Sequence, residues 1–436
     1  MAGAAEAGGT KGRSIPPRAG RRAPFFYGWV VVAAAFAVLF LAFGSAYSFA
    51  TFFAALQDEF AASRGSVSLA FAIAGFIYFS LGALSGTISD RLEPRWVVAG
   101  GMMVVAAGLL LASRATDLGQ IYVAYGIGMG IGVGFAYVPA IGVVQRWFVR
   151  HRGLASGLAV AGIGLGTVSV PPASAWLIQA GGWRTAYVVL GIVVLVVGCG
   201  AALALEKSPD RRGLLPDGDP AGPQPSAAVG APPLAQQDGF GVWQALATRP
   251  FAVLYAASLL GSLGLFVPFV HLVPYARDLG LSPARGALLF SLIGVGSTAG
   301  RFVAGGVADR LGRRISLAGL YGGMGLAFLL WLGAESAWRL AVFALGFGVF
   351  YGGFVALVPA VIADYFGFRS VAGIIGLLYT SVGIGNLVGP TFAGIVFDMW
   401  QSYAAPIAIS AALMLAAAGL TFLLEEPDRW RRRCGL

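Results

Sequence analysis

Charged side chains are scarce in this chain. Asp, Glu, Lys and Arg make up 11% of its 436 residues, and hydrophobic residues make up 58%. A soluble domain carries about 25% charged residues, because its surface must face water. The composition therefore excludes an ordinary water-soluble protein. It favours an all-α integral membrane protein whose surface mostly faces lipid.

Cysteine and clustered metal ligands are also missing. The two cysteines are Cys199 in an apolar run and Cys434 in a basic tail, and two such residues form neither a disulfide framework nor a zinc site. The glycine-rich stretch 128–132 lies inside an apolar run, without the strand that a dinucleotide site requires. With no nucleophile triad or phosphate-cradling loop either, we expect no enzyme, no metal and no cofactor.

The net charge of +10 does not indicate a nucleic-acid partner. The basic residues are scattered between apolar runs instead of being clustered on one element. Positive charge on short loops is what membrane orientation requires. The expected partner is therefore the lipid bilayer, not nucleic acid.

Long apolar runs are what the chain does have. A helix needs about 20 mainly apolar residues to cross the hydrocarbon core of a bilayer. Twelve such runs can be read, at 25–56, 66–88, 96–113, 119–145, 153–179, 184–205, 250–276, 286–307, 315–333, 339–363, 370–397 and 402–424. The first run is longer than the ~7–15 apolar residues of a signal peptide, so it is predicted to remain as a helix.

The segment 207–249 differs from the rest of the chain. It holds seven prolines among Ala, Gly, Gln and charged residues, a composition that cannot bury a core and that predicts a mobile linker. The predicted organisation is a basic tail (1–24), a six-helix bundle (25–206), the linker (207–249), a second six-helix bundle (250–424) and a second basic tail (425–436).

The basic residues predict an orientation. With both termini in the cytoplasm, 22 of the 29 Lys and Arg residues lie on cytoplasmic segments and six lie on outer segments. The remaining one, Arg301, lies inside an apolar run. Because basic loops stay in the cytoplasm, we expect a multi-pass protein of the cell membrane with cytoplasmic N and C termini.

The two halves of the sequence also repeat. The repeated pairs are Gly44-Ser45 with Gly261-Ser262, Asp58 with Asp278, Arg64-Gly65 with Arg285-Gly286, Asp90-Arg91 with Asp309-Arg310, and Val138-Pro139 with Val358-Pro359. All offsets lie between 217 and 221 residues. Parallel repeats of this kind place a binding site near the membrane midplane between two pseudo-symmetric bundles.

Two segments resemble the loop signature of the major facilitator superfamily. The segment Gly305-Gly306-Val307-Ala308-Asp309-Arg310-Leu311-Gly312-Arg313-Arg314 carries the signature, and Gly86-Thr87-Ile88-Ser89-Asp90-Arg91 is a weaker copy. Small residues permit close helix approach, and Asp and Arg can cap helix ends or pair with each other. The resemblance implies the major facilitator fold and a cytoplasmic gate formed by Asp90, Arg91, Asp309, Arg310 and Arg313. The alternative is that both segments are ordinary basic loops. That alternative would explain the arginines but not the recurrence of Gly, Asp and Arg in the same order.

Two further segments resemble the monocarboxylate transporter family. They are Tyr27-Gly28-Trp29-Val30-Val31, which lacks the acidic residue that precedes it in the family, and 146–162, which begins Arg146-Trp147-Phe148-Val149-Arg150. The resemblance implies transport of a small carboxylate such as a lactate-like acid. The family's lysine on the first helix has no counterpart, because the only lysines are Lys11 and Lys207.

Arg301 is the residue we expect to bind the substrate. A charge inside the bilayer is costly, and no Asp or Glu lies inside any predicted helix to neutralise this one. A guanidinium stays charged and offers a planar fork that suits a carboxylate. The family resemblance implies the same role. The alternative is that backbone carbonyls satisfy Arg301, or that it extends to the cytoplasm.

Other polar residues are candidates for supporting roles. Ser297 stands four residues before Arg301, where eukaryotic members of the family have an Asp for proton coupling. The other expected substrate contacts are Tyr137, Tyr351, Tyr379 and Asn386, each of which could instead be a packing residue. His271 is a candidate for proton coupling, or a structural histidine at the outer rim.

The sequence therefore predicts a secondary transporter of small monocarboxylates, linked to protons and working by alternating access. An organic-anion exchanger or an exporter of hydrophobic compounds is the alternative within transport, since Gly162, Gly164, Gly166 and Pro171 resemble antiporter glycine motifs. A membrane sensor without transport is the alternative from another class. It would be expected to carry a folded soluble domain, which 207–249 is too short to form. The oligomeric state is left open.

Overall fold

The computed structural model describes residues 26–218, 239–367 and 369–433, apart from a few side chains. Helices dominate these residues, and the only β-type pairing among them is an isolated bridge between Gly239 and Gly367. The predicted tail 1–24 lies outside the described residues. The prediction of an all-α protein is confirmed.

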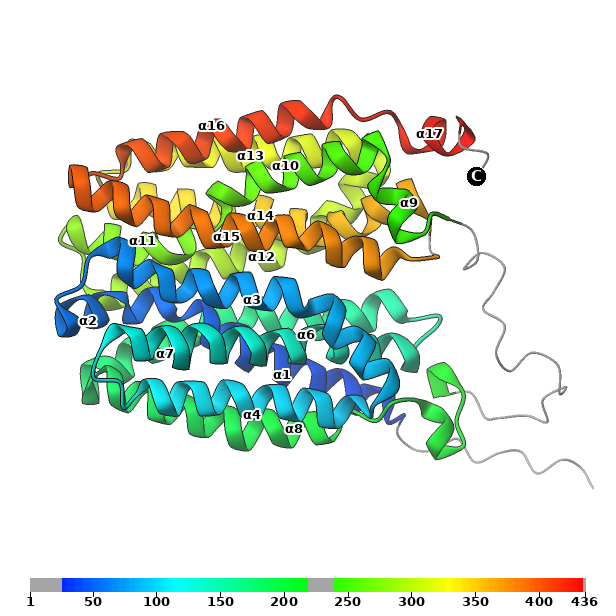
Figure 1. Cartoon of the computed structure of the whole chain (residues 1–436), viewed down its shortest axis with the longest axis horizontal. Helices are drawn as coiled ribbons and strands as arrows, with labels where there is room; N and C mark the ends of the chain where they lie inside the picture. The colour runs from blue at the N-terminus through cyan, green and yellow to red at the C-terminus, as the bar shows by residue number, and fades with distance from the viewer. Residues whose placement is uncertain (1–25, 219–238, 368, 434–436) are drawn as a thin grey trace, which may run out of the picture.

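The long helices run along the long axis of the molecule and form two bundles that lie side by side across it (Figure 1). The N-terminal half comprises α1 (Gly28–Tyr47), α2 (Phe49–Phe60), α3 (Arg64–Arg91), α4 (Pro94–Ala112), α5 (Leu118–Ile121), η1 (Tyr122–Ile127), α6 (Gly128–Trp147), α7 (Arg152–Val193), η2 (Val194–Gly198) and α8 (Cys199–Leu203). The C-terminal half comprises α10 (Arg249–Leu265), α11 (Val267–Asp278), α12 (Pro283–Leu311), α13 (Arg313–Leu332), α14 (Ala337–Phe366), α15 (Val371–Trp400) and α16 (Ala404–Thr421).

Eleven stretches of the described residues are long and apolar enough to span a bilayer. The longest, Gly153–Leu203, has 51 residues. It is interrupted at Gly182, whose φ of 80° and ψ of 166° are not helical, so it covers two of the predicted spans. A positive φ is readily adopted by glycine, which has no Cβ. The structure therefore matches the twelve predicted spans.

The first span of each half is broken at its centre. Ser48 separates α1 from α2, and Phe266 separates α10 from α11 at the equivalent position of the repeat. The Ser48 hydroxyl donates a hydrogen bond to the carbonyl of Ser45 at 2.8 Å, which offers the backbone an alternative to its helical bond. In the second half Pro268 lacks the N–H that a continuous helix would use.

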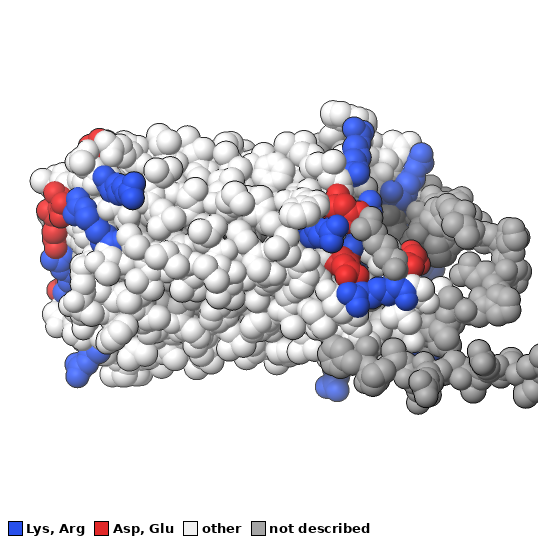
Figure 2. Space-filling view, turned by 90° about the horizontal axis from the view of Figure 1, so that it is seen from below, with Lys and Arg blue, Asp and Glu red and all other residues white. Residues whose placement is uncertain are grey.

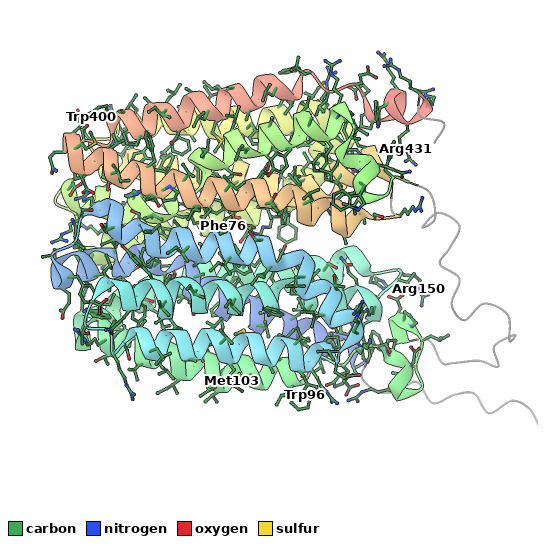
Figure 3. The ribbon with its side chains drawn as sticks, viewed as in Figure 1. Phe76, Trp96, Met103, Arg150, Trp400 and Arg431 are labelled. Atoms are coloured by element: carbon green, nitrogen blue, oxygen red, sulfur yellow. The ribbon has the colours of Figure 1, made fainter. Side chains whose placement is uncertain are left out.

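On the face seen in Figure 2, charged side chains gather toward the two ends of the molecule and leave the middle free of charge. We call the end that carries α9 (Val242–Leu246) and α17 (Pro427–Arg433) the linker end, and the opposite end the loop end (Figure 1). Met103 projects outward from α4, and large exposed tryptophans lie nearer the ends, with Trp400 at the loop end and Trp96 toward the linker end (Figure 3). Tryptophan at both boundaries is typical of membrane proteins.

The segment predicted as a linker carries short turns where it meets the bundles. The turns η3 (Pro209–Arg212) and η4 (Pro216–Gly218) follow the first bundle, and residues 219–238 lie outside the described residues. The Asp217 carboxylate accepts hydrogen bonds from the backbone N–H groups of Val149 and Arg150 at 3.0 and 2.8 Å. Burial alone would raise the pKa of Asp217, but these bonds lower it. The segment is thus attached to the loop between α6 and α7.

Candidate functional site

A cavity lies between the two halves, with about 760 Å³ of empty space when counted out to its open side. Helices α1, α3, α6 and α7 contribute one side, and α10, α12, α14 and α15 contribute the other. Its wall consists of Phe43, Tyr47, Tyr78, Phe79, Gly82, Val133, Tyr137, Val138, Ile163, Leu265, Phe266, Arg301, Tyr351, Phe354, Val355, Val358, Tyr379 and Val382. The pseudo-symmetric repeat predicts a site at this boundary.

Arg301 is the one charged side chain among the described residues of this wall. It extends from α12 toward the other half, where Nη1 donates a hydrogen bond to the carbonyl of Val160 on α7 at 3.0 Å. Its Nε is buried and has no partner among the described residues. Asp309, the one acidic residue of the described helix α12, lies near the linker end, is 72% exposed and pairs with Arg313 at 3.8 Å instead. Arg301 therefore faces the cavity, and the described residues place no carboxylate partner beside it there.

All three predicted tyrosines lie with Arg301 in the cavity wall. Tyr137 comes from α6, Tyr351 from α14 and Tyr379 from α15, and the charge of Arg301 acts on all three hydroxyls. Tyr351 also shares a hydrogen bond of 3.3 Å with Tyr47 across the two halves. The hydroxyls of Tyr137 and Tyr379 have no protein partner in the described part of the chain, so they could bind a ligand.

Two other predicted contacts lie away from the cavity wall. Ser297 is 3% exposed and packs on α14, where its backbone would lie 2.0 Å from a Cβ added at Gly352. Asn386 is fully buried between α15 and α3, and its side-chain amide donates to the carbonyl of Ala72 at 3.2 Å. Both residues hold helices together in this conformation.

Tyr47 and Tyr78, which line the cavity from α1 and α3, were not among the residues predicted from the sequence. Their rings pack around Phe43, with centroids 5.6 and 5.9 Å from its own. Tyr47 follows the repeated Gly44-Ser45 pair at the break between α1 and α2, and that position was the available signal. Tyr78 lies in an apolar run and offered none.

The loop end is closed by an ion pair between the halves. The Arg64 guanidinium, at the start of α3, donates to both carboxylate oxygens of Asp278 on α11, at 2.7 and 2.6 Å. It also donates to the Tyr403 hydroxyl at 2.8 Å. Asp398 of α15 accepts from the backbone N–H groups of Arg64 and Gly65, at 2.9 and 2.8 Å, so a carboxylate of one half caps a helix of the other.

A second ion pair crosses the same boundary. Arg277 donates to Asp58 at 3.1 Å, with both side chains about half exposed or more. Asp58 and Asp278 are equivalent in the sequence repeat, and each pairs with an arginine of the opposite half. The repeated aspartates are visible in the sequence, but these pairs are not, because pairing depends on how the halves meet.

His271 belongs to this closing network at the loop end. Its Nε2 lies 2.8 Å from the carbonyl of Pro390 and its Nδ1 lies 2.9 Å from the Tyr403 hydroxyl. A carbonyl can only accept, so Nε2 carries the proton and Nδ1 accepts from Tyr403. Ser68 of the other half lies 3.2 Å from Nε2. His271 is therefore part of a chain of contacts that includes Arg64.

The predicted gate residues lie at the linker end. Arg91 and Arg310 are exposed, and the side chain of Asp90 lies outside the described part. Arg313 donates to Asp364 at 2.8 Å, within its own half. Both described ion pairs of Arg313, with Asp364 and with Asp309, therefore lie within the C-terminal half, and neither joins the two halves.

Comparison with known proteins gives consistent matches along the chain. The family model of the major facilitator superfamily matches residues 35–347 and 261–433. Human monocarboxylate transporter 11 is 30% identical over 404 residues, covering 90% of this chain and 82% of that protein. Rat monocarboxylate transporter 13 is 30% identical over 419 residues, covering 95% of this chain and 91% of that protein.

Solved structures agree on the fold. A crystal structure of a bacterial homolog to the human lysosomal transporter Spinster, in an inward-facing and unoccupied conformation, matches with a TM-score of 0.70. It is 16% identical and covers 93% of this chain and 98% of its own. The prediction of a transporter, and not an enzyme, is confirmed by the family. This chain is a multi-pass membrane protein that belongs to the major facilitator superfamily and, within it, to the monocarboxylate transporter family.

Proposed function

We propose that the protein carries small monocarboxylates, of which a lactate-like acid is the simplest, across the cell membrane. The observation that carries this proposal is the Arg301 guanidinium in a cavity wall that holds no carboxylate among its described residues. A charged side chain at the centre of a membrane helix costs about 2.5–3.5 kcal/mol on the translocon scale. An anionic substrate would offset that cost. A carboxylate fits the planar guanidinium through two parallel hydrogen bonds.

Transport would follow alternating access, with the two halves rocking around the cavity. The loop-end pairs Arg64–Asp278 and Arg277–Asp58 would close the outer side, and the gate at Asp90, Arg91, Asp309, Arg310 and Arg313 would close the cytoplasmic side in the opposite state. The distribution of Lys and Arg supports cytoplasmic termini, so the linker end would face the cytoplasm. The structure would then correspond to a state with its outer side closed.

We also propose that transport is linked to protons through His271. A proton on Nδ1 would turn that atom from an acceptor into a donor facing Tyr403, whose oxygen already accepts from Arg64. Two donors on one hydroxyl, beside the positive charge of Arg64, would weaken the closed outer end. Asp398 and Asp278 are the acidic groups nearby, and both are engaged by Arg64 or by the start of α3. Protonation from outside would therefore favour opening toward the outside.

Uptake by the purified full chain in liposomes tests the role of Arg301. Arg301→Ala and Arg301→Lys should each lower the initial rate of carboxylate uptake by at least about tenfold, because one loses the charge and the other the bidentate fork. Arg285→Lys is the matched control, since Arg285 lies exposed at the start of the same helix. Full uptake by both Arg301 variants would reject the proposal. Export of uncharged compounds, unaffected by Arg301, would indicate the hydrophobic-compound exporter.

A further inference from the structure

We infer that the cavity selects monocarboxylates with an uncharged aromatic body over lactate-sized hydrophilic acids. The inference rests on the proposed function, because it takes Arg301 as the carboxylate contact. It concerns what the remainder of the cavity would hold. Nine of the residues in its wall are aromatic, and most of the others are aliphatic.

The aromatic rings come from both halves and meet across the cavity. Phe79 of α3 lies 5.6 Å from Phe266 and 5.9 Å from Tyr379 between ring centroids, and both partners belong to the other half. On the first half Phe43 lies 5.4 Å from Tyr137 in an edge-on arrangement. Aromatic rings prefer such edge-on and offset packing, so a planar aryl group would find complementary neighbours on both sides.

A lactate-like acid gains little from such a wall. Its small body would leave most rings without contact, so its binding would remove little apolar surface from water. Burying the phenyl ring of a larger acid removes apolar surface from water and is favourable in proportion to that area. The chemistry of the wall therefore favours the aryl acid.

The charges of the wall set a second limit. With Arg301 as its one charged residue, the described wall has no second cation for a dicarboxylate and no carboxylate for the ammonium group of an amino acid. An uncompensated charge in an apolar cavity is costly. We therefore expect a single carboxylate and no other charged group on the preferred substrate.

Four compounds built on one skeleton separate these requirements. Phenyllactate differs from lactate only by a phenyl ring, phenylalanine replaces its hydroxyl by an ammonium group, and benzylmalonate replaces it by a second carboxylate. A fourth compound, 3-phenylpropane-1,2-diol, lacks the carboxylate. Competition against uptake of radiolabelled phenyllactate by the full chain in liposomes would give an inhibition constant for each compound and for lactate.

Phenyllactate should inhibit about tenfold or more better than lactate, because its ring is buried. Phenylalanine, benzylmalonate and the diol should each inhibit about tenfold or more worse than phenyllactate, because of an unpaired charge or the missing carboxylate. Lactate that inhibits as well as phenyllactate would overturn the inference. Phenylalanine or benzylmalonate as potent as phenyllactate would also overturn it.

A variant of the wall gives a second readout. Phe79→Ala should reduce the preference for phenyllactate over lactate, measured as the ratio of direct uptake rates. Phe76→Ala should leave that ratio as it is, because Phe76 lies on the same helix, is 36% exposed and is not in the wall (Figure 3). An unchanged ratio in Phe79→Ala would contradict the inference.

The direct uptake rates also distinguish a failure of the aromatic selection from a failure of the proposed function. If lactate and phenyllactate are taken up equally well and both depend on Arg301, the aromatic selection fails and the proposed function stands. If neither uptake depends on Arg301, the proposed function fails and the inference fails with it.

Discussion

Arg301 is the only charged residue between Gly286 and Ala308 of α12. Its bond to the Val160 carbonyl satisfies one N–H group and leaves the net charge in place. A carbonyl supplies a partial negative charge, whereas a carboxylate supplies a full one and accepts two of the five N–H donors at once. At the scale of single residues, this difference is why a substrate anion can compete with the contact present in the structure.

His271 provides a prediction at the same scale. His271→Gln removes the titrating ring, so an inward proton gradient should no longer accelerate net uptake into liposomes, while exchange of labelled for unlabelled acid should continue. Exchange moves no net proton and does not need the switch. His151→Gln is the matched control, because His151 is the only other histidine and lies exposed at the linker end beside Asp217.

A His271→Gln protein whose net uptake responds to the gradient as strongly as the wild type would contradict this role. The proton would then travel with the acid or through another group. Loss of exchange together with net uptake would instead mark His271 as structural.

Single residues differ in how far the sequence could predict them. Arg301 was predictable because a charge in an apolar run has few explanations. Arg64 was not, because at the end of a run it looks like any boundary arginine, and only the meeting of two halves reveals Asp278. Ser297 and Asn386 share helices with cavity residues but pack elsewhere, since helical spacing gives a face and not the neighbour that covers it.

At the scale of elements, two of the helix crossings that join the described parts of the halves depend on glycine. Helix α3 crosses α15, and α7 crosses α12, and each crossing is made close by glycine. A Cβ added at Gly75 of α3 would lie 1.7 Å from the Asn386 amide nitrogen, and one at Gly164 of α7 would lie 2.1 Å from the Thr298 hydroxyl. Small residues allow such close approach in membranes.

The first crossing can be tested with one methyl group. Gly75→Ala would force Asn386 aside, and overpacking of a tight interface costs about 1–3 kcal/mol. Because this contact is made with the loop end closed, we expect initial uptake to fall by about tenfold. Gly100→Ala is the control: Gly100 is an exposed helical glycine with nothing within 4 Å of an added Cβ.

Wild-type uptake by Gly75→Ala would show that the crossing is not under this constraint. The control should retain uptake and gain stability, because alanine favours a helix over glycine by about 1 kcal/mol.

The membrane spans were predictable from the length and apolarity of their runs. The breaks within them were less so. Pro268 gives a signal near the break before α11, but Ser48 gives almost none, because a serine in an apolar helix usually continues it. The short turns η3 and η4 were not predictable either. The proline-rich composition describes 207–249 as a whole and carries no sign of the contacts that Asp217 makes with 149–151.

At the scale of the whole molecule, the orientation in the membrane is testable by labelling. Single cysteines at Glu335, at the loop end, and at Asp210, at the linker end, would be placed in a Cys199→Ala, Cys434→Ala background. A membrane-impermeant maleimide should label Glu335→Cys on intact cells and Asp210→Cys only after permeabilisation. The opposite pattern would contradict the orientation deduced from the basic residues.

The paired architecture was predictable because the repeat offsets cover nearly half the chain, and two similar halves imply a shared boundary. Which side of that boundary is closed was not predictable. The sequence is compatible with several arrangements of the same two bundles. The choice among them depends on weak contacts such as Arg277–Asp58, whose partners are largely exposed.

The central claim is that Arg301 holds a substrate carboxylate, and a thermodynamic cycle measures that contact directly. Binding of phenyllactate and of its uncharged amide would be measured for the wild type and for Arg301→Gln by calorimetry on the purified full chain. We predict that the wild type prefers the acid and that the variant loses the preference, with a coupling of at least about 1.4 kcal/mol, or tenfold. Equal preference for the acid in both proteins would contradict the account.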